Sequence, residues 1–287
     1  MRYAFLCMTY IPAVILLAGC NLGHRIPVEM TTMEQSRALE AETSLKADIS
    51  MDIGSLEISG GSAPDLYSVN LEYDRACYTP EIDYRSGAEG RLVFKLERSH
   101  KGGIRSEGNH NRVRLSLADS LPLNLQVNTG VGDARLALSN LRLTQLSLEA
   151  GVGGAKISAY EPNPVICDQI RLRNGVGGLD AVGLGNLNFR RFDYEGGVGG
   201  ADLDFSGEWK QDAQITIQVG VGGVSLRLPR EVGARVTAEK HFLSGLQLDG
   251  FRKDSSEDYY SNNYEDTKIR VTIVVKTGIG GFRISWI

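Results

Sequence analysis

Apolar and polar residues alternate on both sides of a glycine-rich tetrad that recurs along this chain. The tetrad reads Gly-Val-Gly-Asp once, Gly-Val-Gly-Gly four times and Gly-Ile-Gly-Gly once, and its copies start at Gly130, Gly151, Gly175, Gly197, Gly220 and Gly278. Strict alternation predicts a short strand with one buried face before each tetrad and another after it. The glycines mark the corner between the two strands, where the backbone needs a positive φ or a close approach to its neighbour.

The alternation identifies the side chains that should face the core. They lie three and five positions before each tetrad, and one and three positions after it. Before the tetrads they are Leu125 and Val127, Leu146 and Leu148, Ile170 and Leu172, Phe192 and Tyr194, Ile215 and Ile217, and Ile273 and Val275. After the tetrads they are Ala134 and Leu136, Ala155 and Ile157, Leu179 and Ala181, Ala201 and Leu203, Val224 and Leu226, and Phe282 and Ile284. We expect all of these side chains to point inwards.

The spacing of the tetrads is regular. The first five copies start 21, 24, 22 and 23 residues apart. A period of this length is typical of a solenoid, in which each turn buries its apolar edge against its neighbours. The 34 glycines, the eight prolines and the lack of a long apolar stretch with helical period agree with an all-β chain. The predicted fold is an all-β, single-stranded parallel β-solenoid with roughly 22-residue turns and Gly-Val-Gly-Gly corners.

Charged residues outside the predicted core also fall into columns one period apart. Opposite charges come into register at Glu149–Arg173–Glu195, Arg171–Asp193, Lys156–Asp180 and Asp204–Arg227. Such pairs between neighbouring strands contribute about 0.2–1 kcal/mol each and favour parallel, in-register stacking. Like charges also stack, at Arg135 over Lys156 and at Asp180 over Asp202. The alternative interpretation is that the columns are a solvated face with no further role.

The regular repeat covers only part of the chain. The segment from Leu45 to Ser59 contains a degenerate copy of the repeat and opens a β-rich N-terminal part over 45–120. The solenoid repeat domain is predicted over 121–287. Within it, the segment from Val236 to Leu248 reads as a turn without tetrad glycines, and a polar loop follows from Phe251 to Lys268.

The N-terminus predicts the cellular address. A basic residue and a short apolar run lead to Leu17-Ala18-Gly19-Cys20, which resembles the lipobox of bacterial lipoproteins. Residues 1–19 are therefore predicted to be a lipoprotein signal peptide, with Cys20 acylated and 20–44 forming a flexible tether. The chain would then be extracytoplasmic and anchored to a bacterial membrane by lipid, with the outer membrane open because Asn21 is not the aspartate of inner-membrane retention. An ordinary signal peptide with a chance cysteine is the alternative.

Composition and motifs exclude several kinds of chemistry. The formal charge of −4 leaves no basic patch for nucleic acid. No dinucleotide fingerprint, phosphate-binding loop or calcium nonapeptide repeat fits the tetrads. The histidines, His24, His100, His110 and His241, lack zinc-ligand spacing. No cofactor, metal site or catalytic residue is predicted. Cys77 and Cys167 remain in the folded part, either as a disulfide or as two buried free thiols.

Several segments carry a resemblance to a known family. They are Leu184 to Phe192 with the following GGVGGADLDFSG, Leu226 to Arg230, Gly250 to Lys253 and Tyr259 to Tyr264. The chain resembles the toast-rack family, domain of unknown function 2154, from about Gln35 to Ile287. The family is related to the extracytoplasmic C-terminal domain of LiaF-type cell-envelope-stress proteins. The resemblance implies a β-solenoid-like fold outside a membrane and supplies no catalytic residue. Only the first tetrad keeps the acid common in the family, at Asp133, and the transmembrane helices of the LiaF type are missing.

Two functional classes stay open. The first is a non-catalytic scaffold that contacts an unknown envelope protein or glycan in envelope stress or adhesion, besides the membrane lipid held through Cys20. The second is a carbohydrate-active β-helix enzyme or a glycan-binding protein. The candidate contact site is the loop with Phe251, Tyr259, Tyr260 and Tyr264, because tyrosine rings offer a large contact area with a polar tip. The alternative is that these rings cover the open edge of the last turns.

Overall fold

The computed structural model describes residues 27–99, 111–238, 245–254 and 258–287. The described residues form β-strands and one 3-10 helix, η1 (Leu184–Leu187). The predicted signal peptide, Cys20 and all four histidines lie outside them. No helix among the described residues is long and apolar enough to cross a membrane.

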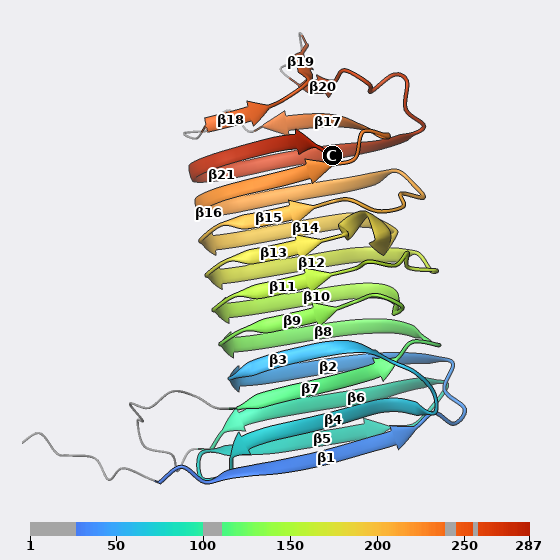
Figure 1. Cartoon of the computed structure of the whole chain (residues 1–287), viewed down its shortest axis with the longest axis vertical. Helices are drawn as coiled ribbons and strands as arrows, with labels where there is room; N and C mark the ends of the chain where they lie inside the picture. The colour runs from blue at the N-terminus through green and yellow to red at the C-terminus, as the bar shows by residue number, and fades with distance from the viewer. Residues whose placement is uncertain (1–26, 100–110, 239–244, 255–257) are drawn as a thin grey trace, which may run out of the picture.

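The repeats form a flattened solenoid in which each turn contributes a strand to each of two layers (Figure 1). The first layer contains β8 (Pro122–Val131), β10 (Arg142–Val152), β12 (Cys167–Val176) and β14 (Phe189–Val198). The second contains β9 (Ala134–Ala137), β11 (Ala155–Ser158), β13 (Leu179–Val182) and β15 (Ala201–Asp204). Two longer strands, β16 (Ala213–Leu228) and β21 (Ile269–Trp286), run through both layers. Successive turns pair in parallel and in register, which confirms the predicted solenoid.

The core lies between the two layers. Every side chain that the alternation places inwards is buried. Leucine and isoleucine fill most turns, while Phe189, Phe192 and Phe205 pack with Trp209 beside η1. Burying one such large apolar side chain stabilises the fold by about 1.5–3 kcal/mol. Because each turn is buried only by its neighbours, the stack depends on close contact between turns.

Close stacking explains the first two glycines of the tetrad. Gly177, the second glycine of its tetrad, has φ +140°, and a Cβ built there would lie 1.9 Å from the carbonyl oxygen of Gly153 in the previous turn. Its N–H donates to the carbonyl of Val198 at 2.9 Å, which continues the backbone ladder through the corner. The third position differs, because a Cβ on Gly178 would find its nearest neighbour 4.0 Å away. Stacking therefore requires the first two glycines and leaves the third unexplained.

The N-terminal end of the solenoid does not follow chain order. The first turn consists of β2 (Ser44–Ile53) and β3 (Ser55–Gly61), with Gly54 at its corner. It is the predicted degenerate repeat, and its core residues are buried. This turn lies between β8–β9 on one side and the turn of β6 (Glu89–Arg98) and β7 (Arg112–Ala118) on the other (Figure 1). A later segment thus covers the first turn.

The C-terminal end repeats this arrangement. Strand β21 lies between β16 and the turn of β17 (Val232–Ala238) and β18 (Gly245–Leu248) (Figure 1). The last segment of the chain is thus inserted beneath an earlier one, which is the turn predicted without tetrad glycines. The first turn of the chain, β2–β3, and its last, β21, each have a hydrogen-bonded neighbour on both sides, so neither can fray without breaking two ladders.

Antiparallel strands close both ends of the stack. At the N-terminal end these are β1 (Met30–Ala38), β4 (Asp65–Asp74) and β5 (Tyr78–Arg85), and at the C-terminal end β19 (Phe251–Lys253) and β20 (Tyr259–Ser261). The predicted flexible tether over 20–44 is wrong for residues 30–38, because these form β1. Among the described residues this edge strand pairs with β4 alone, and it is largely exposed, so its sequence shows little apolar alternation.

Candidate interaction edge

The second residue of every tetrad points out of the protein at the corner of the solenoid. Val131, Val152, Val176, Val198 and Val221 are 45–51% exposed, and Ile279 is 66% exposed. These residues stack in register from turn to turn, and the half-buried Ile53 extends the row at its N-terminal end. We call the seven residues the apolar edge. At about 4.8 Å per turn the edge is about 29 Å long.

An exposed row of this length needs a reason. Single exposed apolar residues are common on proteins, whereas continuous exposed apolar patches mark contact surfaces. The tetrad also supplies six aliphatic residues at a position that contributes little to the core. Sequence reasoning missed this edge, because the alternation applies to the two strands and leaves the corner residue between them unassigned. The valine is exposed because it lies beyond the last core position of the turn.

Two charged columns flank the apolar edge. Column A lies two positions before each tetrad and consists of Asn128, Glu149, Arg173, Glu195, Gln218 and Lys276. Column B lies five positions after each tetrad start and consists of Arg135, Lys156, Asp180, Asp202, Ser225 and Arg283. The columns belong to the first and second layer respectively, so one runs along each side of the edge.

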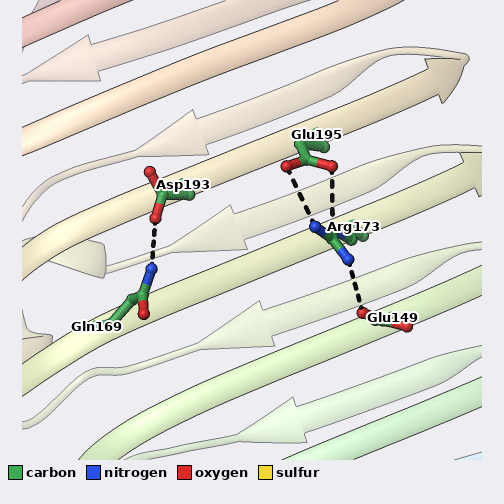
Figure 2. Close-up of polar contacts among 5 residues, drawn as sticks. All are labelled: Glu149, Gln169, Arg173, Asp193 and Glu195. Carbon is green, nitrogen blue, oxygen red and sulfur yellow. Dashed lines mark hydrogen bonds and ion pairs between the residues drawn. The ribbon is translucent and has the colours of Figure 1, made fainter.

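Column A is held by ion pairs between neighbouring strands. Figure 2 shows Arg173 on β12 between Glu149 on β10 and Glu195 on β14. Its Nη1 lies 3.1 Å from Glu149 Oε1, and its Nε lies 3.0 Å from Glu195 Oε2. The hydrogen bond that Arg173 donates to Glu195, followed by the negative charge of Glu195, raises the pKa of the Arg173 guanidinium. Beside the column, Gln169 Nε2 donates to Asp193 Oδ2 at 2.8 Å.

Column B separates its charges into two blocks. Arg135 lies beside Lys156, and Asp180 lies beside Asp202. Arg135 also pairs with Glu57 at 3.5 Å. Within the described ranges Lys156, Asp180 and Asp202 form no salt bridge. Column B therefore presents a basic block and then an acidic block to solvent.

A groove lies along each column, lined by the side chains of that column. The groove on the side of column A has a volume of about 770 Å³ and is floored by the first tetrad glycines, including Gly175, Gly197 and Gly220. The groove on the side of column B measures about 380 Å³ and includes the third glycines Gly154 and Gly178. The third glycines of these tetrads therefore line the groove of column B.

The predicted contact loop covers the last turn. Phe251 stacks on Trp286 with ring centroids 5.5 Å apart, and Tyr260 meets Tyr264 edge to face at 5.0 Å. Strand β20, which includes Tyr259 and Tyr260, pairs with β17, and Asp258 Oδ2 accepts from Arg235 Nη2 at 2.6 Å. The four aromatic side chains are half-buried. Their observed contacts are those of a cap on the end of the solenoid.

A known family model matches most of this chain. The family model for the N-terminal domain of toast_rack, domain of unknown function 2154, matches residues 26–180 and 163–227. The chain belongs to the toast-rack family. A provisionally assigned cell adhesion protein from Clostridium sporogenes is 19% identical, with 90% of this toast-rack chain and 100% of the other covered and a TM-score of 0.48. A provisionally assigned adhesin from Bacteroides fragilis is 13% identical, with 89% and 97% covered and a TM-score of 0.41. No curated protein matches the sequence.

The two cysteines of the folded toast-rack chain do not form a disulfide. Both thiols are free and buried. Cys167 begins β12, whereas Cys77 lies between β4 and β5, and strands β10, β8, β2 and β6 separate the two positions. A disulfide needs Cα atoms within about 7 Å, so the proposed bridge is wrong. Burial raises the pKa of the Cys167 thiol to about 12, which keeps it protonated.

Proposed function

We propose that this toast-rack protein is a lipid-anchored, extracytoplasmic, non-catalytic module that binds another protein of the cell envelope along its apolar edge. The single observation that carries the proposal is the row of seven stacked aliphatic residues on a rigid corner. Each exposed valine sits on a backbone hydrogen-bonded to the turns on both sides, so binding would order little additional chain.

The charged columns support a scaffold more than an enzyme. Catalytic acids and bases need free carboxylates with perturbed pKa values that converge on one cavity. In column A the Arg173 guanidinium instead bridges Glu149 and Glu195 across three strands. These side chains stabilise the stack, and the grooves beside the edge are open along their length.

The anchor would keep the module near a membrane. The sequence Leu17-Ala18-Gly19-Cys20 supports acylation of Cys20, and several acyl chains on one residue anchor stably. Ten residues lead from Cys20 to Met30, where β1 starts, so the link spans at most about 35 Å. From β1 to β18 eleven strands follow one another in the second layer, which makes the stack about 48 Å long. The edge would be presented along the side of this stack.

Three measurements test the proposal. The Cys20→Ser variant should leave the membrane fraction or remain uncleaved, and mass spectrometry that finds a different mature N-terminus without acyl chains contradicts the anchor. A photo-cross-linking residue at Val176 should capture a protein in native envelopes, whereas the same residue at Glu161, on the loop opposite the corner, should not. Equal capture at both positions contradicts the edge as the binding surface. Release of sugars from envelope polysaccharide by the purified protein, lost in Asp202→Asn, contradicts the non-catalytic role.

A further inference from the structure

The block arrangement of column B is unfavourable within one chain. Arg135 and Lys156 are direct neighbours in parallel strands, and so are Asp180 and Asp202. Like charges at such positions destabilise a sheet, and alternating charges would avoid the repulsion. The stacking of the solenoid gives no reason for grouping the basic residues and then the acidic residues. The grouping points to a binding partner with complementary charges.

We propose that the partner on the apolar edge is a second copy of this chain, paired antiparallel about a two-fold axis between the turns of Val152 and Val176. The inference rests on the proposed function, since it names the protein that binds the edge. A two-fold axis at this place, perpendicular to the solenoid axis, brings the two edges together in opposite directions.

Six of the seven residues of the apolar edge match under this symmetry. Val152 of one copy lies opposite Val176 of the second copy, Val131 opposite Val198, and Ile53 opposite Val221, and each match occurs twice. Stacking of the turns is in register, so these matches follow from the turn order alone. Burial of the exposed halves of these side chains would drive association.

The charges match as well. Because the axis keeps column B opposite column B, Lys156 faces Asp180 of the second copy and Arg135 faces Asp202. In column A, Glu149 faces Arg173 of the second copy. The repulsive blocks of one chain thus become attractive pairs between two chains.

Only the outermost turns oppose like charges. Arg114 of the turn formed by β6 and β7 would face Arg283 of the second copy. Arg114 already pairs with Glu57 at 3.4 Å and with Glu72 at 4.0 Å. Glu57 also pairs with Arg135, and Glu72 with Arg112, so the chain offsets this repulsion only in part. Lys95, in register with column A on β6, would likewise face Lys276 of the second copy, and it pairs with Glu81 at 3.5 Å.

A parallel dimer fits less well. A two-fold axis along the solenoid would place column A against column B of the same turn. Two contacts would be attractive, Glu149 with Lys156 and Arg173 with Asp180. Three would join like charges, Glu195 with Asp202, Lys276 with Arg283 and Lys95 with Arg114. The antiparallel dimer has three attractive contacts and two that join like charges. Charge complementarity selects the antiparallel arrangement.

The first test is a charge swap in the full-length protein in detergent, with dimerisation followed by analytical ultracentrifugation. Asp202→Arg relieves repulsion from Asp180 within the chain but opposes Arg135 of the second copy, so it should weaken the dimer about tenfold or more. The double variant Arg135→Asp with Asp202→Arg should restore it. Glu161→Arg makes the same change of charge on the opposite loop and should leave the dimer unchanged. A single Asp202→Arg that dimerises as wild type, or a double variant without rescue, overturns the antiparallel pairing.

The second test maps the orientation by disulfide formation. In the antiparallel dimer the two copies of residue 198 lie three turns apart, about 14 Å, which is too far for a bridge. Val198→Cys alone should therefore give no cross-link, whereas an equal mixture of Val198→Cys and Val131→Cys should. Cross-linking of Val198→Cys with itself indicates a parallel dimer and overturns the proposal.

Failure of the dimer and failure of the proposed function give different results. A monomer at all concentrations, together with capture of a different protein from Val176, overturns the dimer and leaves the edge as a binding surface. A monomer without any capture at Val176 overturns both.

Discussion

The sharpest prediction concerns two adjacent glycines of one corner. Gly177 and Gly178 belong to the same tetrad and lie in the same corner. They differ in the space that a Cβ would find between stacked turns. We compare Gly177→Ala with Gly178→Ala, because the two variants have the same composition and differ only in the position of one methyl group. Alanine has the higher helix propensity, but neither position is helical, so that difference does not enter.

The structure sets the size of each effect. Alanine at 177 must adopt φ +140°, a strain of about 1–3 kcal/mol. Its Cβ would also lie 1.9 Å from the Gly153 carbonyl oxygen, so the two turns must move apart and loosen the backbone ladder at the corner. The sum is a loss of at least about 3 kcal/mol in the free energy of unfolding. Alanine at 178 meets nothing closer than 4.0 Å and should change that free energy by less than about 0.5 kcal/mol.

Thermal unfolding of the full-length protein, followed by circular dichroism, measures both variants. The melting temperature should fall by about 6–12 °C for Gly177→Ala and by less than about 2 °C for Gly178→Ala. Melting of both variants within about 2 °C of wild type would show that the corner is not closely stacked. A larger loss in Gly178→Ala than in Gly177→Ala would contradict the assignment of the close contact to Gly177.

Three further predictions concern the ends and the core. The hydrogen bond that Tyr84 donates is the main cause that lowers the pKa of Glu42 below its ordinary value of 4.5. This pair therefore stabilises the fold above that pH, and its contribution is lost as the pH falls. Urea unfolding at pH 7 and pH 4 should show a smaller decrease in the free energy of unfolding for Tyr84→Phe than for wild type. Cys167, with its pKa raised to about 12, should react with a thiol reagent only after unfolding, and fast labelling of the native protein would contradict its burial. Removing the cap rings in Tyr260→Ala with Tyr264→Ala should lower the melting temperature by several degrees and leave binding intact; lost binding at an unchanged melting temperature would instead support the loop as a contact site.

The regular turns could be predicted from sequence because one pattern fixes both strand and face. Period-two alternation assigns Phe192 and Leu203 to the core, and the fixed spacing of tetrads predicts parallel neighbours. The degenerate turn at Gly54 was recoverable for the same reason, since its alternation survives the loss of the tetrad.

The order of the turns at the two ends could not be predicted. Alternation shows that β2–β3 and β6–β7 are turns, but either could lie against β8–β9, because both present an apolar face and a free ladder. Which of the two turns lies against β8–β9 depends on the path of the connecting loops, and the spacing of apolar residues carries no information about that path. The apolar edge was hidden by a different limit, since alternation describes strands and the valine stands where the strand bends.

If the apolar edge is a binding surface, it is covered in the native envelope. A cysteine at Val176, labelled with a membrane-impermeant maleimide, measures this when labelling rates are compared between dilute purified protein and native envelopes. A cysteine at Glu161, on the opposite side of the same stack, controls for general access. We predict fast labelling at 176 in the dilute protein, strong protection at 176 in the envelope, and equal labelling at 161 in both. Equal rates at 176 in the two preparations would contradict the edge as a binding surface.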